Sequence, residues 1–190
     1  ALAGGFSAAS KGAAGAAISV VAVENDVTAE AVNADIDAGT LLSVDADAVT
    51  GAASTAVSAA VSTKMALDGS AAFTSLDNDV TARLHDATVT GTADVTVAAE
   101  DRSVAGTLAG AVAASNMASF GVGFALNRLD GDVTAEVAGG SVGGESLMVE
   151  ADSDVDAHAG AVGLSASAKA GVAGALATNV VASDVSALIR

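Results

Sequence analysis

The chain has 190 residues, of which 52% are hydrophobic but only 2% aromatic, and it contains no Trp, Tyr, Cys or Pro. Ala and Val therefore supply most of the apolar content, so we expect a shallow core and no large ligand pocket. A formal net charge of -16, from 23 acidic and 7 basic residues, excludes nucleic acid as a partner, because phosphate backbones are bound by clustered Lys and Arg. The lack of Cys excludes disulfides and thiolate metal sites.

The first segment, residues 1–23, is small and apolar. We expect neither a membrane span nor a signal peptide here, because Lys11 interrupts the segment, a basic leader is missing, and Gly and Ala outnumber Leu and Ile. Segments of the same kind recur later in the chain.

An internal repeat organises the whole sequence. Asp26, Asp79 and Asp132 each open the sequence Asp-Val-Thr-Ala, and Asp184 opens Asp-Val-Ser-Ala, at separations of 53, 53 and 52 residues. The chain then divides into a partial repeat (1–25), three full repeats (26–78, 79–131 and 132–183) and a second partial repeat (184–190). We interpret residues 1–190 as one continuous array and expect it to be an excerpt of a longer protein.

Apolar and polar residues alternate after each of these Asp residues. This period of two predicts a strand with one buried face, with Val80, Ala82 and Leu84 pointing inward in the second copy. The aligned columns are Val27, Val80, Val133 and Val185; Thr28, Thr81, Thr134 and Ser186; and Ala29, Ala82, Ala135 and Ala187.

A second strand is predicted at residues 42–47, 95–100 and 147–152, where Leu or Val leads each copy. Between the two strands lies a short apolar column of Ile36, Val89 and Val142, which Gly residues follow as turn formers.

The remaining half of each repeat is a low-complexity mixture of Ala, Gly, Ser and Val. Ala favours helix, but Gly is scattered through the interior of these runs and no charged helical face is present, so strands are the better interpretation. Two sheets with Ala, Gly and Ser between them can lie closer than the usual separation of roughly 10 Å.

These columns predict an all-β fold, a parallel β-solenoid (β-helix) built from repeats of about 53 residues. Each column would then climb the stack at the strand spacing of roughly 4.8 Å. Whether a repeat forms one wide coil or two narrower coils stays open, because no half-period of about 26 residues is evident.

The stacked Asp residues are the candidate binding site. Carboxylates stacked at strand spacing repel one another, and Ca2+ between coils would relieve that repulsion. The preferred alternative is a turn, because Asp and Asn cap backbone groups before strands. The residues of this candidate Ca2+ ladder are Asp26, Asp79, Asp132 and Asp184, with the neighbouring Asp77 and Asp130.

Other candidate residues favour a structural interpretation. Outward carboxylates such as Asp47, Glu100 and Asp152 are repeated surface positions, whereas a catalytic pair needs two different environments. His85 and His158 occupy inequivalent positions and have no third histidine to complete a metal site. Lys11, Lys64 and Lys169 align and would either keep a sheet face soluble or form a partner-binding stripe, and the mixed Thr column leaves ice binding as a minor alternative.

The succession from Gly12 to Ala48, "GAAGAAISVVAVENDVTAEAV…IDAGTLLSVDADA", with its echoes in later copies, resembles the repeats of large bacterial surface and secreted proteins. These are filamentous-haemagglutinin-like exoproteins, adhesins and repeat-rich leukotoxins. The resemblance implies a parallel β-solenoid shaft that is exported and acts at the bacterial cell surface or outside the cell.

We therefore expect a structural repeat region of an adhesin or filament-forming surface protein that acts as a stiff rod. Its partners would be neighbouring repeats, copies of itself, or a host or matrix surface. The alternative is a module whose acidic columns bind Ca2+ or carbohydrate. An enzyme is not expected, because a repeated surface offers no unique cleft.

Overall fold

A computed structural model describes all residues, 1–190, and consists of β-strands joined by turns. Sheet A contains β1 (Leu2–Ala9), β4 (Leu41–Ser62), β7 (Asp94–Ser115) and β10 (Ser146–Ser167), in that order. Sheet B contains β2 (Gly12–Val32), β5 (Met65–His85), β8 (Ala118–Ala138) and β11 (Ala170–Ile189). Sheet C contains the short strands β3 (Asp35–Ala38), β6 (Thr88–Gly91) and β9 (Ser141–Val142). None of these elements is a helix that could cross a membrane.

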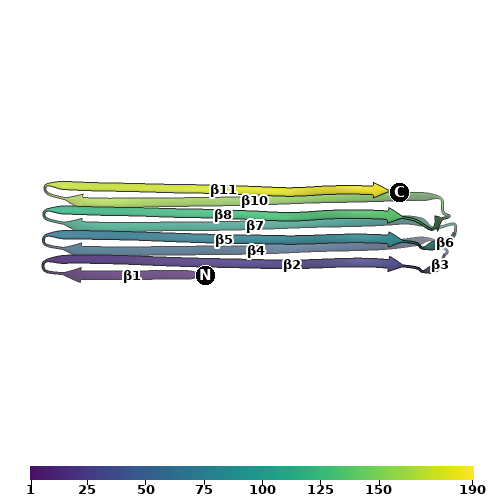
Figure 1. Ribbon diagram of the computed structural model, residues 1–190, viewed down its shortest axis with the longest axis horizontal. Coiled ribbons are helices and arrows are strands. Elements are labelled where there is room, and N and C mark those ends of the chain that lie inside the picture. The colour runs from purple at the N-terminus through teal and green to yellow at the C-terminus, as the bar shows by residue number, and fades with distance from the viewer.

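The chain visits the three sheets in a fixed sequence, from sheet B through sheet C to sheet A and back to sheet B (Figure 1). We call one such passage a circuit. Every neighbouring pair of strands is parallel. The prediction of an all-β fold with parallel strands is confirmed.

The register of the strands places equivalent residues beside one another. Val27 pairs with Val80, Val80 with Val133, and Val185 with Val133, and Ile36 pairs with Val89 in sheet C. One circuit therefore advances the chain by 53 residues, and in the last circuit by 52. In this register, equivalent residues of the sequence repeat lie one circuit apart.

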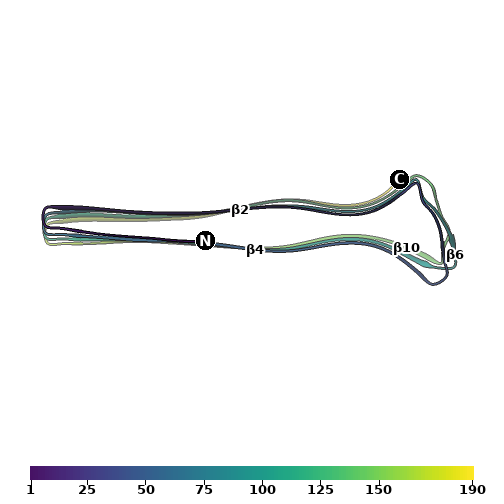
Figure 2. The ribbon, with the colours of Figure 1, turned by 90° about the horizontal axis from the view of Figure 1, so that it is seen from below.

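The cross-section has two unequal parts (Figure 2). Sheets A and B run close together over about half of their length, then diverge, and sheet C closes the wider space between them. We call the close part the narrow half, with residues 1–22, 53–75, 106–128 and 159–180, and the remainder the wide half. Strands of 21 or 22 residues make each sheet roughly 70 Å wide.

A Val and Leu core fills the wide half. Val80, Val95, Val97 and Val133 are fully buried, and Leu84 packs among them. These inward positions follow the alternation that the sequence predicted, and they bring all three sheets into one cluster. Burial of each such side chain stabilises the fold by about 1.5–3 kcal/mol.

The narrow half has an interior of Ala, Ser and Gly. Ala56, Ala72, Ala109 and Ala125 are fully buried between sheets A and B. A Cβ atom built on Gly121 of β8 would lie only 2.4 Å from the carbonyl oxygen of Leu164 in β10. The two backbones are thus so close that only the smallest side chains fit between them.

A buried polar layer separates these two interiors. The Asn78 amide Nδ2 donates to Asp101 Oδ1 at 2.8 Å and to Ser103 Oγ at 2.7 Å, and so joins sheet B to sheet A. In the preceding circuit Asn25 Nδ2 donates to Thr50 Oγ1 at 2.7 Å. Such bonds satisfy polar groups that would otherwise be buried without partners.

The turns lie at positions other than the Asp column. Asn33, Asp86 and Gly139 follow the sheet B strands with φ angles of 51°, 49° and 68°. Asn, Asp and Gly are the residues that adopt this left-handed conformation most readily. The interpretation of the Asp26, Asp79, Asp132 and Asp184 column as a turn is wrong, because these residues lie within long strands of sheet B.

The close approach of the sheets predicts a specific intolerance. We expect Gly121→Ala to destabilise the fold by about 1–3 kcal/mol, because the new methyl group collides with the β10 backbone. Thermal or urea unfolding measures this loss. Gly69→Ala is the matched control, since its Cβ would meet nothing nearer than the Val122 carbonyl oxygen at 3.9 Å. Equal losses in the two variants would contradict the close packing.

Candidate functional site

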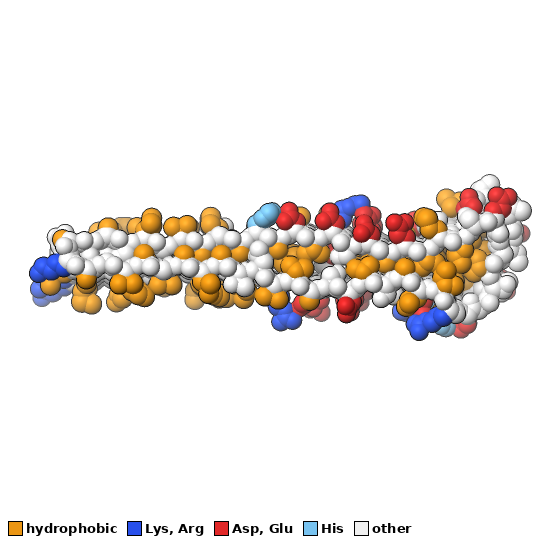
Figure 3. All heavy atoms as spheres, turned by 90° about the horizontal axis from the view of Figure 1, so that it is seen from above, with side chains coloured by type: hydrophobic (Ala, Val, Ile, Leu, Met, Phe, Trp, Pro, Cys, Tyr) orange, Lys and Arg blue, Asp and Glu red, His pale blue; other side chains and the backbone are white.

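The predicted site residues lie on the outer face of sheet B in the wide half. Asp26, Asp79, Asp132 and Asp184 are exposed and stack in register across β2, β5, β8 and β11. Asp77 and Asp130 form the adjacent column with Glu24. Further carboxylates, including Asp47, Glu100 and Asp152, lie on the outer face of sheet A. Figure 3 looks along the stacking direction and shows acidic side chains on both outer faces of the wide half.

Asp79 is the carboxyl group that this stacking affects most. Partial burial raises its pKa above the usual range, and the charges of Asp132, Asp77 and Asp26 raise the pKa further. A backbone hydrogen bond at Asp132 opposes the rise. The ionised form of Asp79 is therefore less stable in the folded chain than in water, as expected for like charges at strand spacing.

The stacked carboxylates do not converge on one point. No group of three or more His, Cys, Asp or Glu side chains in residues 1–190 is arranged to hold a metal ion. Each column is a line of single carboxylates, one per circuit, with nearly the same surroundings. A bound Ca2+ would therefore have to bridge neighbouring circuits, and the Ca2+ ladder stays a prediction.

Opposite charges meet at one corner of sheet B. Glu136 is buried, and its carboxylate accepts a hydrogen bond from Arg190 Nε at 2.6 Å and lies 3.3 Å from Arg83 Nε. The Arg190 hydrogen bond lowers the pKa of Glu136, and the charges of Arg190 and Arg83 lower it further against the effect of burial. These groups, with His85, line a hollow of about 600 Å³. The cluster serves to pair charges between successive circuits.

The two histidines lie in different sheets, and only His85 borders this hollow. His85 ends β5 in sheet B and lies 3.1 Å from Asp86, whereas His158 lies in β10 of sheet A, 3.0 Å from Asp156. Each ring contacts a carboxylate next to it along the chain. The structure brings neither histidine to a nucleophile or to a shared metal position.

Two buried carboxylates were not singled out from the sequence. Asp101 accepts hydrogen bonds from Asn78 and Ser103 within the polar layer. Asp68 Oδ2 accepts from Ser58 Oγ at 2.9 Å and from the Val112 amide at 2.8 Å, while Oδ1 has no partner. Asp68 faces inward by the alternation counted from Val80 of the same strand, and Asp101 by the alternation counted from Val97, so this count was the signal that could have found them.

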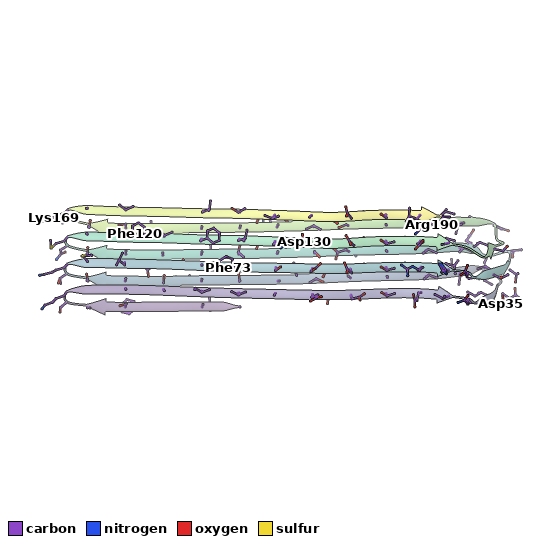
Figure 4. The ribbon with its side chains drawn as sticks, viewed as in Figure 1. Asp35, Phe73, Phe120, Asp130, Lys169 and Arg190 are labelled. Carbon is purple, nitrogen blue, oxygen red and sulfur yellow. The ribbon has the colours of Figure 1, made fainter.

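Large apolar side chains lie on the outside of the narrow half. The chain has four Phe residues as its only aromatic residues, and Phe6, Phe73, Phe120 and Phe124 all lie on outer faces. Figure 4 labels Phe73 and Phe120, and Figure 3 shows hydrophobic side chains along both outer faces of this half. The alternation could have shown this too, because Ala71, in register with Phe124, is an odd number of residues from the inward Val80.

A scan against protein-family models found no match, and searches of curated proteins and of solved structures found none either.

The stacked carboxylates predict that removal of the Asp79 charge increases the stability of the fold in a pH-dependent way. The pKa of Asp79 is raised in the folded chain, so the folded chain is more stable while Asp79 is protonated. It loses this stability as the pH rises through the pKa of Asp79. We expect Asp79→Asn to stabilise the fold at pH 7 by about 0.2–1 kcal/mol, the size of a cross-strand charge pair. Thermal melts should show this gain vanishing below roughly pH 3, where aspartate is protonated in both states.

Asp37→Asn is the matched control, since Asp37 pairs with the uncharged Thr90. A gain of the same size in this control would contradict the role of stacking.

The same melts test the Ca2+ ladder, which predicts a higher midpoint of the unsubstituted chain at millimolar Ca2+ than in NaCl of equal ionic strength. An equal midpoint in both salts would contradict the ladder.

Proposed function

We propose that this chain is a structural repeat region, a parallel β-solenoid of about 53 residues per coil that serves as a stiff shaft. The observation that supports this most directly is the unbroken register, in which equivalent residues of β2, β5, β8 and β11 lie side by side. Each coil contacts only its neighbours, so coils can be added without limit and stiffness follows from the continuous hydrogen bonding along the stack.

The geometry makes this shaft a ribbon. One circuit uses 53 residues to rise by the spacing between strands, about 4.8 Å, while the width stays near 70 Å. A narrower coil would gain the same height with fewer residues. Most residues of a circuit therefore add width to the faces and not height to the stack, and we infer that these broad faces are part of the function.

The resemblance to filamentous-haemagglutinin-like exoproteins supports placing the shaft outside the cell or on the bacterial surface. There it would carry an adhesive region or form part of a filament. Exposed acidic columns on the wide half support this role, because mutual repulsion of like-charged surfaces favours solubility. The composition, with 7 Lys and Arg residues against 23 Asp and Glu residues, does not favour nucleic acid as a partner.

Lengthening the array tests the proposal. We expect ten further copies of residues 79–131, inserted after residue 131, to raise the stack by about 48 Å at constant width. Negative-stain electron microscopy should show straight ribbons, and the melting temperature should not fall, because each coil adds an interface. Flexible chains of separate particles, or a width that grows with the number of copies, would contradict a solenoid shaft.

A further inference from the structure

In the narrow half of sheet B, small side chains face the interior and large apolar side chains face outward. Ala and Ser occupy its buried face, whereas Leu67 and Phe120 are 48% and 43% exposed on its outer face. Phe73 and Phe124 pack against each other there, with ring centroids 5.5 Å apart. Soluble monomers rarely expose a continuous apolar patch of this kind, and such patches mark interaction sites.

We propose that this outer face binds a second copy of the chain, face to face and with the strand directions opposed. The twofold axis of this dimer is parallel to the stacking direction and passes near Ala71 and Phe124. Binding of a second copy goes beyond a structural role, because it depends on the outer surface of sheet B and not on the location of the array.

Charge complementarity fixes the relative direction of the two copies. Lys64 lies at the tip of the narrow half, in the turn between β4 and β5, and Asp77 and Asp79 lie beyond the apolar patch on the same strand. Parallel superposition would place Asp columns against Asp columns. The twofold axis instead lays Lys64 of each copy over the Asp77 to Asp79 segment of the other.

Two pairs of facing positions fit the same register. Counting outward from the axis, Phe73 of one copy falls over Gly69 of the other, and Phe120 falls over Arg128. A large ring over a glycine permits interdigitation, and a guanidinium over an aromatic face is a favourable cation–π pair.

The area of the patch is sufficient for association. A patch about nine residues long on each of the four strands covers roughly 30 Å by 19 Å, or about 570 Å² on each copy. The total of about 1,100 Å² is near the lower bound for a specific interface and increases with each added coil.

The observations favour a second copy over a lipid bilayer as the occupant. A bilayer would have to accept Lys11, Lys64 and Lys169 at the leading tip of the narrow half, together with the buried Asp68 carboxylate. Charged side chains are costly in the hydrocarbon region, and open sheet edges do not occur there. A partner copy offers carboxylates at the position of the lysines.

Sedimentation equilibrium of the 190-residue chain tests the proposal. We expect reversible dimers, and at least a tenfold higher dissociation constant for the double variant Phe120→Thr with Phe124→Thr. Leu108→Thr is the matched control, because Leu108 is 48% exposed, close to the 43% of Phe120, but lies on the outer face of sheet A. Thermal melts confirm that each variant is folded.

A charge exchange tests the opposed direction of the strands. Lys64→Glu and Asp77→Lys should each weaken the dimer several-fold, and the double variant should restore it, since each copy then presents the reversed pair. A chain that stays monomeric at protein concentrations up to about 100 µM, the range of weak affinities, would overturn the proposal. A monomeric chain that floats with phosphatidylcholine vesicles would overturn it as well. Loss of dimers in Leu108→Thr to the same degree, or no rescue in the double variant, would overturn the assigned face or direction.

Discussion

The parallel backbone hydrogen bonds between successive circuits are the constraint on which the rest of the structure depends. Of 125 backbone hydrogen bonds, 112 lie within strands, and they hold equivalent residues beside one another. Each residue therefore has the residue at the equivalent position of the next circuit about 4.8 Å away. Val stacks on Val in the wide half and stabilises the core, but Asp stacks on Asp on its outer face and opposes folding. The alternation of Glu and Arg where Glu136 meets Arg83 shows how a column avoids that repulsion.

The spacing between sheets A and B determines where large side chains can go. At the wide half sheet C holds the sheets apart, so Val and Leu fill the interior and carboxylates face water. At the narrow half the sheets touch, so Ala, Ser and Gly fill the interior, and Phe73, Phe120 and Phe124 lie outside. One repeated sequence thus combines an ordinary apolar core with a thin plate whose outer faces are apolar. A second copy would convert the exposed patch of sheet B into a second apolar interior.

The sequence predicted the features that depend on local alternation and on the repeat. Val80, Ala82 and Leu84 point inward as expected, and the columns of Val and Asp stack in the expected order. It failed where alternation says nothing about the path of the chain. The Asp column was interpreted as a turn because Asp is common in turns, whereas the strand continues through it and turns at Asn33, Asp86 and Gly139. The outward position of Phe124, by contrast, follows from the alternation, because its register partner Ala71 is an odd number of residues from the inward Val80.

Electron paramagnetic resonance can measure directly whether equivalent residues of successive circuits stack in register. The chain has no Cys, so Cys at Thr28, Thr81 and Thr134 can be labelled selectively with nitroxides. These positions are neighbours in register on β2, β5 and β8, so we expect a single exchange-narrowed line from labels about 4.8 Å apart along the column. Three resolved lines without spin exchange, in a chain that melts normally, would contradict stacking in register.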